Sequence, residues 1–135
     1  MADQLVFISH GGEDIWIAKQ IARGITERGG RPFLDQADIA IGANFEDEIR
    51  RFLGEAHELV VLFTPWSIDR PYVWMEIGAA WIRELPVVVI LLGLTPDDLR
   101  RMPKMPAYLE KRAMIQLNDV EGYLDQVGKR VAGGT

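Results

Sequence analysis

The sequence predicts an α/β fold in which helices cover both faces of a five-stranded parallel sheet, a flavodoxin-like three-layer sandwich. Segments typical of strands and of helices alternate about five times along the 135 residues, which is the pattern of parallel sheets joined by crossover helices. Several strand segments are short, continuous apolar runs, as in strands that are buried on both faces. Because crossovers are right-handed, few topologies remain, and the flavodoxin-like strand order is our first choice.

The predicted strands, in chain order, cover residues 5–8, 31–34, 59–63, 87–92 and 114–117. The first, third and fourth are wholly apolar, which suits strands in the interior of a parallel sheet. Pro32 lacks a backbone donor, so the second strand is expected at an edge, or to start at this point. Pro86 directly precedes the fourth strand, which is the most strand-like stretch of the chain.

The predicted helices cover residues 13–28, 45–56, 71–84 and 119–131, with a short helix and turns among the prolines of residues 95–111. In the first helix, apolar residues from Ile15 to Ile25 recur on one face, and Gly29 with Gly30 ends it. Asn44 is the expected N-cap of the second helix.

Length and composition indicate one soluble domain over residues 1–135, with residues 133–135 as a disordered tail or a cloning remnant. The formal net charge of −5 argues against a nucleic-acid-binding face and against docking on anionic membranes. The chain has no cysteine, which excludes disulfides and thiolate metal sites, and its two histidines are too far apart to indicate a metal site. No secretory signal precedes the first strand and no apolar run approaches the ~20 residues that span a bilayer, so we expect a cytoplasmic protein.

Glu76 stands out because of the residues that share its face of the predicted helix. At about 100° per residue, an aromatic side chain one turn earlier and small side chains one turn later fall on the same side. These neighbours are Tyr72, Ala79, Ala80 and Arg83. Small residues leave room and an aromatic ring offers a flat apolar surface, so this face indicates either a binding site or a helix with one solvent-exposed acid, and the rest of the chain has to decide between them.

Other conspicuous residues have ordinary structural explanations. Trp74, Ile77 and Trp81 lie opposite Glu76 and are expected in the core. Glu13 and Asp14 lie in a first helical turn, where acids interact favourably with the helix dipole. The acids at residues 46–48 are expected to begin a solvated helix, and Arg50 and Arg51 to be their ordinary surface partners.

Ligands of such sheets bind beyond the carboxyl ends of the strands. The loops at that end begin at Ser9, Asp35, Thr64 and Gly93, and the Glu76 helix follows the third of these loops. We therefore expect Glu76 at the same rim of the sheet.

Three groups of residues, in order, resemble those of the Toll/interleukin-receptor (TIR) domain family. Residues 7–14 (FISHGGED) are similar to its first box, and residues 33–49 to its second strand, its "BB" loop and the following helix. Tyr72 and Glu76, four apart, resemble its aromatic-x-x-x-Glu helix. The resemblance covers residues 4–132 and looks closest to the bacterial immune-effector branch.

Many domains of that branch cleave NAD+ at the nicotinamide–ribose bond, so the resemblance implies an NAD+ nucleosidase with NAD+ as substrate, no other cofactor and no metal. The family's catalytic glutamate matches Glu76, and Tyr72 stands where the family usually has tryptophan. Basic residues that some members carry after the first strand are replaced by Gly11 and Gly12. The pyrophosphate would then meet backbone N–H groups at the helix start, or Arg70.

One carboxylate is sufficient for this chemistry, because nicotinamide leaves NAD+ as a neutral molecule and needs no general acid, unlike the leaving groups of ordinary glycosidases. Glu76 would orient the ribose hydroxyls and stabilise the oxocarbenium-like transition state. Tyr72 or Trp66 would pack against the pyridinium, and Ser9 and His10 would line the floor.

The remaining candidate substrate-binding residues are Gly11, Asp35 and Gly42. Asp35 and the loop to Gly42 would gate the site, since glycine permits the backbone conformations that a gate needs.

The main alternative is a non-catalytic TIR–TIR interaction or scaffold domain. The two functions are compatible, because in the family assembly often completes the active site. We therefore expect activation by self-association, a role in antiphage defence or signalling, and a sensor domain or partner protein as trigger. A phospho-receiver would need an aspartate at the end of the third strand, where the chain reads Phe63-Thr64-Pro65. A dinucleotide-binding dehydrogenase would need G-x-G-x-x-G after the first strand, which is absent.

Overall fold

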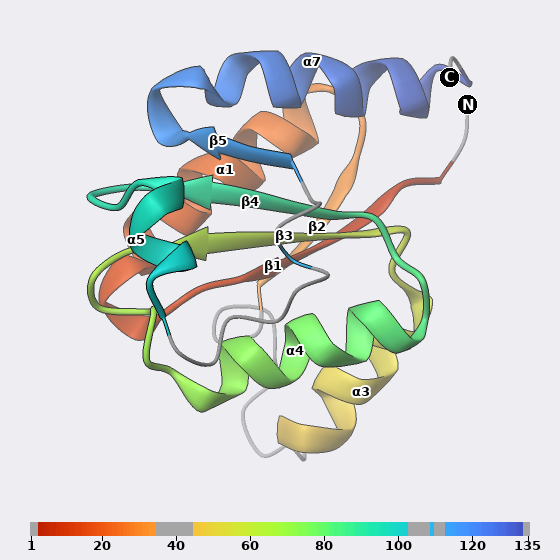
Figure 1. Ribbon diagram of the computed structural model, residues 1–135. Helices are drawn as coiled ribbons and strands as arrows, with labels where there is room; N and C mark the ends of the chain where they lie inside the picture. The colour runs from red at the N-terminus through yellow and green to blue at the C-terminus, as the bar shows by residue number, and fades with distance from the viewer. Residues whose placement is uncertain (1–2, 35–44, 103–108, 110–112, 134–135) are drawn as a thin grey trace.

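The computed structural model describes residues 3–34, 45–102, 109 and 113–133. Its centre is a five-stranded, all-parallel sheet in the order β2-β1-β3-β4-β5 (Figure 1). The strands are β1 (Leu5–Ser9), β2 (Arg31–Leu34), β3 (Glu58–Phe63), β4 (Val87–Leu91) and β5 (Ala113–Gln116). This is the flavodoxin-like order, and the predicted fold class is confirmed.

The position of each strand in the sheet follows from its composition. The apolar strands β1, β3 and β4 lie inside the sheet, and β1 and β3 are buried along their whole length. Pro32 lies on β2, an edge strand as expected. The other edge strand, β5, is only partly buried, and it begins at Ala113 rather than Met114.

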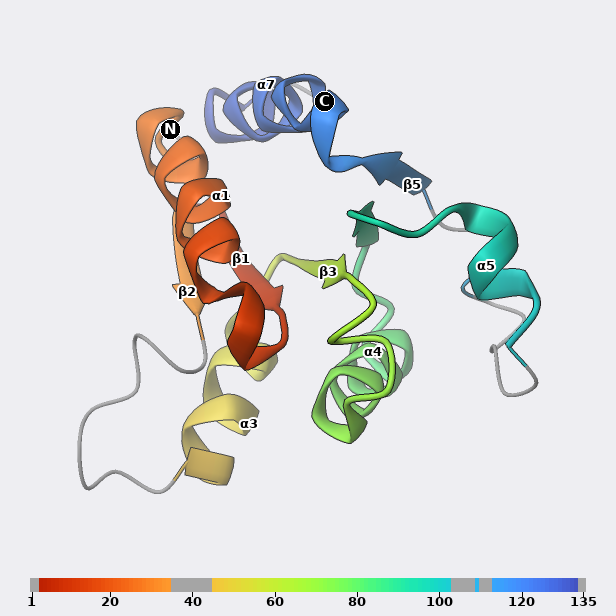
Figure 2. The ribbon, with the colours of Figure 1, turned by 90° about the vertical axis from the view of Figure 1, so that its left-hand side faces the viewer.

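The helices form one layer on each face of the sheet (Figures 1 and 2). They are α1 (Ile15–Glu27), α3 (Phe45–Glu55), α4 (Pro71–Ile82), α5 (Pro96–Arg100) and α7 (Val120–Val131), with short 3-10 turns at Gly12–Asp14 and Leu117–Asp119. Helices α1 and α7 cover one face, and α3 and α4 cover the other. The predicted first and last helices therefore each begin with a 3-10 turn before the α-helix.

Alternation along β1 divides the apolar side chains between two cores. Leu5 and Phe7 belong to the core under α3 and α4, and Val6 and Ile8 belong to the core under α1 and α7. Successive side chains of a strand point to opposite faces, so a continuous apolar run is what a two-sided sheet requires. Ser9 is the last residue of β1, where it pairs with Val61 of β3.

A buried acid at the amino end of the sheet ties the last helix to the strands. Glu58 begins β3 and is buried, and its carboxylate accepts hydrogen bonds from Tyr123 Oη (2.6 Å) and from Arg130 Nε (3.1 Å) and Nη2 (3.0 Å). Gln4 donates a further bond at 2.7 Å. Burial, and then the neighbouring carboxylate, raises the pKa of Tyr123 well above its usual value, so the phenol stays protonated and donates.

Replacing Arg130 with alanine would leave the buried Glu58 carboxylate without its cation. Loss of one partner of a fully buried pair costs about 3–5 kcal/mol. The Arg130 side chain is 35% exposed, so we expect the free energy of unfolding to fall by about 2–3 kcal/mol. Urea unfolding would measure this, with Arg100→Ala, which removes an exposed pair with Asp97, as the control that changes by less than about 1 kcal/mol. Equal losses in the two variants would contradict the assignment.

Candidate active site

Glu76 lies on α4 at the border between its buried face and its open face. The buried face carries Val73, Ile77 and Ala80, which belong to the core on this side of the sheet. Glu76 itself is only 1% exposed. A buried carboxylate needs polar partners to offset its lost hydration, so its hydrogen bonds determine how it is held.

Two expectations about this helix are wrong. Ala80 packs into the core rather than in front of Glu76, and Trp81 is 50% exposed rather than buried. Ala80 lies on the helix's stripe of buried residues, and Trp81 is rotated about 100° away from it. Trp74 lies on the same side as Trp81 but is partly buried, because its ring packs against Phe63 with centroids 5.1 Å apart.

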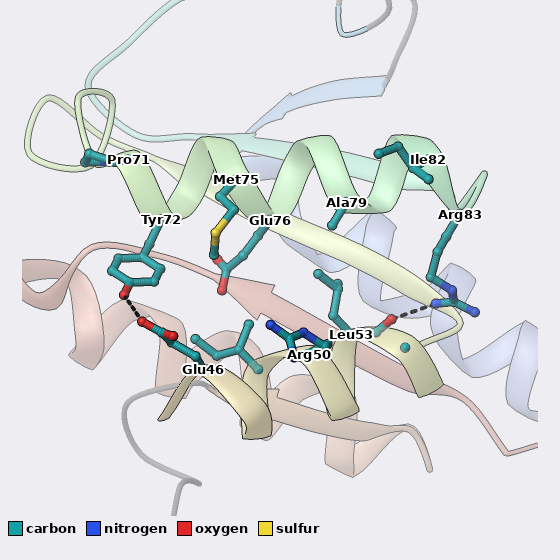
Figure 3. Close-up of a pocket in the computed structure, with 12 residues that line it drawn as sticks. Glu46, Arg50, Leu53, Pro71, Tyr72, Met75, Glu76, Ala79, Ile82 and Arg83 are labelled. Carbon is teal, nitrogen blue, oxygen red and sulfur yellow. Dashed lines mark hydrogen bonds between the residues drawn. The ribbon is translucent and has the colours of Figure 1, made fainter. Parts of the chain in front are cut away.

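A groove of about 690 Å³ lies between α4 and α3 (Figure 3). Its walls are largely apolar with a few charged side chains. The lining residues are Glu46, Ile49, Arg50, Leu53 and Gly54 from α3, and Pro71, Tyr72, Met75, Glu76, Ala79, Ile82 and Arg83 from α4 and its C-cap. The side chain of Glu76 extends from α4 towards α3 (Figure 3). The acid is thus buried and yet borders an open groove.

Ser9 holds the Glu76 carboxylate from the side of the sheet. The Ser9 hydroxyl donates to Glu76 Oε1 at 2.5 Å, and Ser9 is fully buried. Hydrogen bonds to an ionised acceptor are short and strong. We expected Ser9 to line the substrate site, but it is not among the residues that line the groove. Its hydroxyl reaches the Glu76 carboxylate from the end of β1, and its call as a substrate-binding residue stays a prediction.

His10 and Gly11, the other two predicted substrate-binding residues after the first strand, lie directly beyond Ser9. Both are buried, and His10 Nδ1 lies 2.8 Å from the carbonyl oxygen of Gly11. Neither lines the groove between α3 and α4. A Cβ on Gly11 would come within 3.2 Å of Ser67 Cβ, so the loop after β1 packs closely against the loop after β3 at this point.

Asp14 also takes part in the contact between these two loops, whereas we had expected it to interact with the helix dipole. Asp14 is buried and accepts a hydrogen bond of 2.6 Å from Thr64 Oγ1. The loops after β1 and β3 are therefore joined by a buried polar contact. Beside it, Arg70 pairs with Glu13 at 2.5 Å. A backbone hydrogen bond, and then Arg70, lowers the pKa of Glu13.

Arg70 and Trp66 were alternatives for binding the pyrophosphate and the pyridinium, respectively. Neither lines the groove beside Glu76. Tyr72 does line it, and its hydroxyl donates a long hydrogen bond of 3.5 Å to Glu46 on the opposite helix (Figure 3). Asp35 and Gly42, with the N-cap Asn44, lie outside the described residues.

The sequence reasoning missed the wall that faces Glu76. Glu46, Arg50 and Leu53 line the groove from α3, whereas we had expected Glu46 and Arg50 to be ordinary surface charges. Their spacing of three and four residues places them on one face of the helix. That signal was present in the sequence, but it does not say which neighbour the face meets.

Among the described residues, no group of three or more histidine or acidic side chains could hold a metal ion. Within that same part of the chain, no helix is long and apolar enough to cross a membrane.

Fold and site together define a flavodoxin-like α/β domain with a buried acid near the carboxyl end of its first strand. The model of the TIR domain family matches residues 6–130. The chain therefore belongs to the TIR domain family, as the resemblance of its three boxes predicted. No curated protein sequence is significantly similar to it.

Solved structures share this fold at low identity. The TIR domain of the Toll-related receptor TRR-2 from Hydra magnipapillata is 15% identical, over 94% of this chain and 97% of that one, with a TM-score of 0.69. The TIR domains of the activated Roq1 resistosome, which recognises the pathogen effector XopQ, are 19% identical, over 98% of this chain and 86% of that one (TM-score 0.65). A 2-deoxyribosyltransferase from Bacillus psychrosaccharolyticus is 12% identical, over 88% and 91% of the two chains (TM-score 0.62).

Proposed function

We propose that this TIR domain is an NAD+ nucleosidase that cleaves the nicotinamide–ribose bond, with Glu76 as its catalytic residue. The observation that carries the proposal is the setting of this acid. Glu76 is buried, is hydrogen-bonded to Ser9 and borders an open groove. A largely apolar concave site with a few fixed polar groups is the usual form of a small-molecule site.

The reaction breaks the bond between the ribose C1′ and the pyridinium nitrogen. The bonding electron pair moves to the nitrogen, which becomes neutral, and positive charge develops on the ribose. The Glu76 carboxylate would stabilise that charge and orient the ribose hydroxyls. Water then adds to C1′ and loses a proton to give ADP-ribose, or a nucleophile within the same molecule closes a cyclic product.

Two neighbours support Glu76 in this role. The hydrogen bond from Ser9 fixes the position of the carboxylate, so little reorganisation is needed as charge develops. Tyr72 lies one turn earlier and lines the same groove. Its ring can pack against the pyridinium, an attraction of about 0.5–2 kcal/mol.

Glu76→Gln should lower the rate of nicotinamide release by at least about 100-fold, because it removes the charge that stabilises the transition state. The amide oxygen can still accept from Ser9, so we expect the free energy of unfolding to change by less than about 1 kcal/mol. Chromatography of nicotinamide from concentrated protein, with a crowding agent, measures the activity. The control Glu46→Gln removes the charge of the other acid that lines the groove, and it should retain most of the nicotinamide-releasing activity. The proposal fails if the unsubstituted protein releases no nicotinamide or if Glu76→Gln remains active.

Ser9→Ala should lower kcat roughly tenfold or more, because a hydrogen bond to a charged group is worth about 1.5–3 kcal/mol, while KM changes little. Ser67→Ala is the matched control, since Ser67 is also fully buried and donates to the Leu62 carbonyl oxygen. Both variants are expected to lose some stability, but only Ser9→Ala should lose kcat. A similar kcat for the two variants would show that Ser9 does not position the acid.

The second candidate function is a TIR–TIR interaction domain, and exposed apolar side chains near the end of α4 favour self-association. Trp81 is half exposed and Ile82 is 76% exposed, and exposed apolar clusters mark interaction surfaces. Self-association would also activate the enzyme. We assign the protein to the cytoplasm and to antiphage defence or signalling, with a sensor domain or partner protein as its trigger.

Ile82→Lys should weaken self-association, because it places a charge in this exposed apolar surface. Sedimentation velocity over a range of concentrations would show the change, and Glu76→Gln should assemble like the unsubstituted protein. Assembly of the unsubstituted protein without any release of nicotinamide would favour the scaffold function. Unchanged assembly in Ile82→Lys would exclude this end of α4 from the contact.

A further inference from the structure

The groove beside Glu76 has two cationic lining residues within the described part of the chain, Arg50 and Arg83. The guanidinium of Arg83 is used within the protein. Its Nη1 donates to the carbonyl oxygens of Leu53 (2.6 Å) and Ala56 (3.2 Å), at the end of α3. Arg83 thus satisfies helix-end carbonyls and joins α4 to α3.

Arg50 is placed differently. Its side chain is 81% exposed, and its ion pair with Asp47 is 3.6 Å long and solvent-exposed, a type of pair that contributes little. Figure 3 shows its guanidinium on the α3 side of the groove, across from Glu76 and Met75 of α4. The guanidinium is therefore available to a ligand in the groove at little loss.

The next residue offers a comparison on the same helix. Arg51 pairs with Glu48 and Glu55, and its guanidinium lies 4.8 Å from the centre of the Phe52 ring. It does not line the groove. Arg50 and Arg51 therefore have equal charge and adjacent positions, but only Arg50 borders the groove.

The position of Arg50 matters for the charge that a ligand meets in the groove. The chain carries a net charge of −5, and the groove contains the acids Glu46 and Glu76, so an anionic ligand would be repelled without a cation. The substrate of the proposed reaction has a cationic pyridinium and an anionic phosphate on either side of one ribose. Glu76 lies on the α4 wall and Arg50 on the α3 wall, which also carries Glu46, so an acid and a guanidinium reach the groove from facing helices.

Resting on the proposed function, we propose that Arg50 binds the phosphate on the ribose that is cleaved, and so selects substrates with a 5′-phosphate on the nicotinamide riboside. A guanidinium donates two parallel hydrogen bonds to phosphate and stays charged. In this proposal Arg50, rather than backbone N–H groups or Arg70, binds the phosphate of the substrate.

Steady-state kinetics with NAD+, nicotinamide mononucleotide and nicotinamide riboside test the assignment. Arg50→Ala should raise KM for the first two roughly tenfold, as loss of a charge-assisted hydrogen bond predicts, with kcat nearly unchanged. Cleavage of the riboside, which has no phosphate, should stay the same. Arg50→Lys should recover part of the loss, and Arg51→Ala should match the unsubstituted protein. Equal KM values for Arg50→Ala and Arg51→Ala would overturn the proposal. So would a rise in KM for nicotinamide riboside in Arg50→Ala as large as the rise for NAD+.

A binding experiment separates this proposal from the proposed function. Isothermal titration with ADP-ribose, which keeps the diphosphate but has no bond to cleave, should show roughly tenfold weaker binding to Arg50→Ala than to Arg51→Ala. If ADP-ribose binding depends on Arg50 but the protein does not cleave NAD+, the phosphate-binding role of Arg50 stands and the nucleosidase function is refuted. Cleavage of NAD+ with ADP-ribose binding unaffected by Arg50→Ala would refute the phosphate site alone. Absence of ADP-ribose binding to the unsubstituted protein would also overturn it.

Discussion

The site depends on one short hydrogen bond between the sheet and a helix, from Ser9 to Glu76. Ser9 is the last residue of β1, and its position is fixed by pairing with Val61 of β3. On the other side, α4 is anchored by Val73 and Ile77 in the core. The carboxylate is therefore held between a paired strand and a helix anchored in the core, and packing rather than a loop determines where the acid lies.

The two walls of the groove are attached to the fold in different ways. The α4 wall follows a loop that is joined to the start of α1 by the Asp14–Thr64 contact. The α3 wall rests on the core through Ile49 and Leu53, and Arg83 links it to α4. The two walls therefore share one core and one direct link, so the groove between them is part of the packed fold.

Periodicity was enough to predict the sheet and the burial of Ile77, because those follow from which residues can be buried at all, and the handedness of crossovers then left few strand orders. It was not enough for Trp81 and Ser9. Apolar character alone placed Trp81 in the core, but Trp81 is half exposed, whereas Trp74 on the same side of the helix packs against Phe63. Ser9 was correctly placed at the rim of the sheet, but its hydroxyl points to Glu76. Contacts between side chains from distant segments decide such cases, as they do for Arg50.

The burial of Glu76 bears on the choice between the proposed enzyme and the alternative scaffold. Burying a carboxylate removes its hydration, and replacing buried charges with well-packed apolar residues is often neutral or stabilising. Glu76 is 1% exposed and lies beside the apolar core, so its lost hydration is a cost that the hydrogen bond from Ser9 offsets in part. A domain that acted only through its exposed surfaces would gain nothing from this acid. A domain that stabilises positive charge in the groove requires it, and that difference favours catalysis over assembly alone.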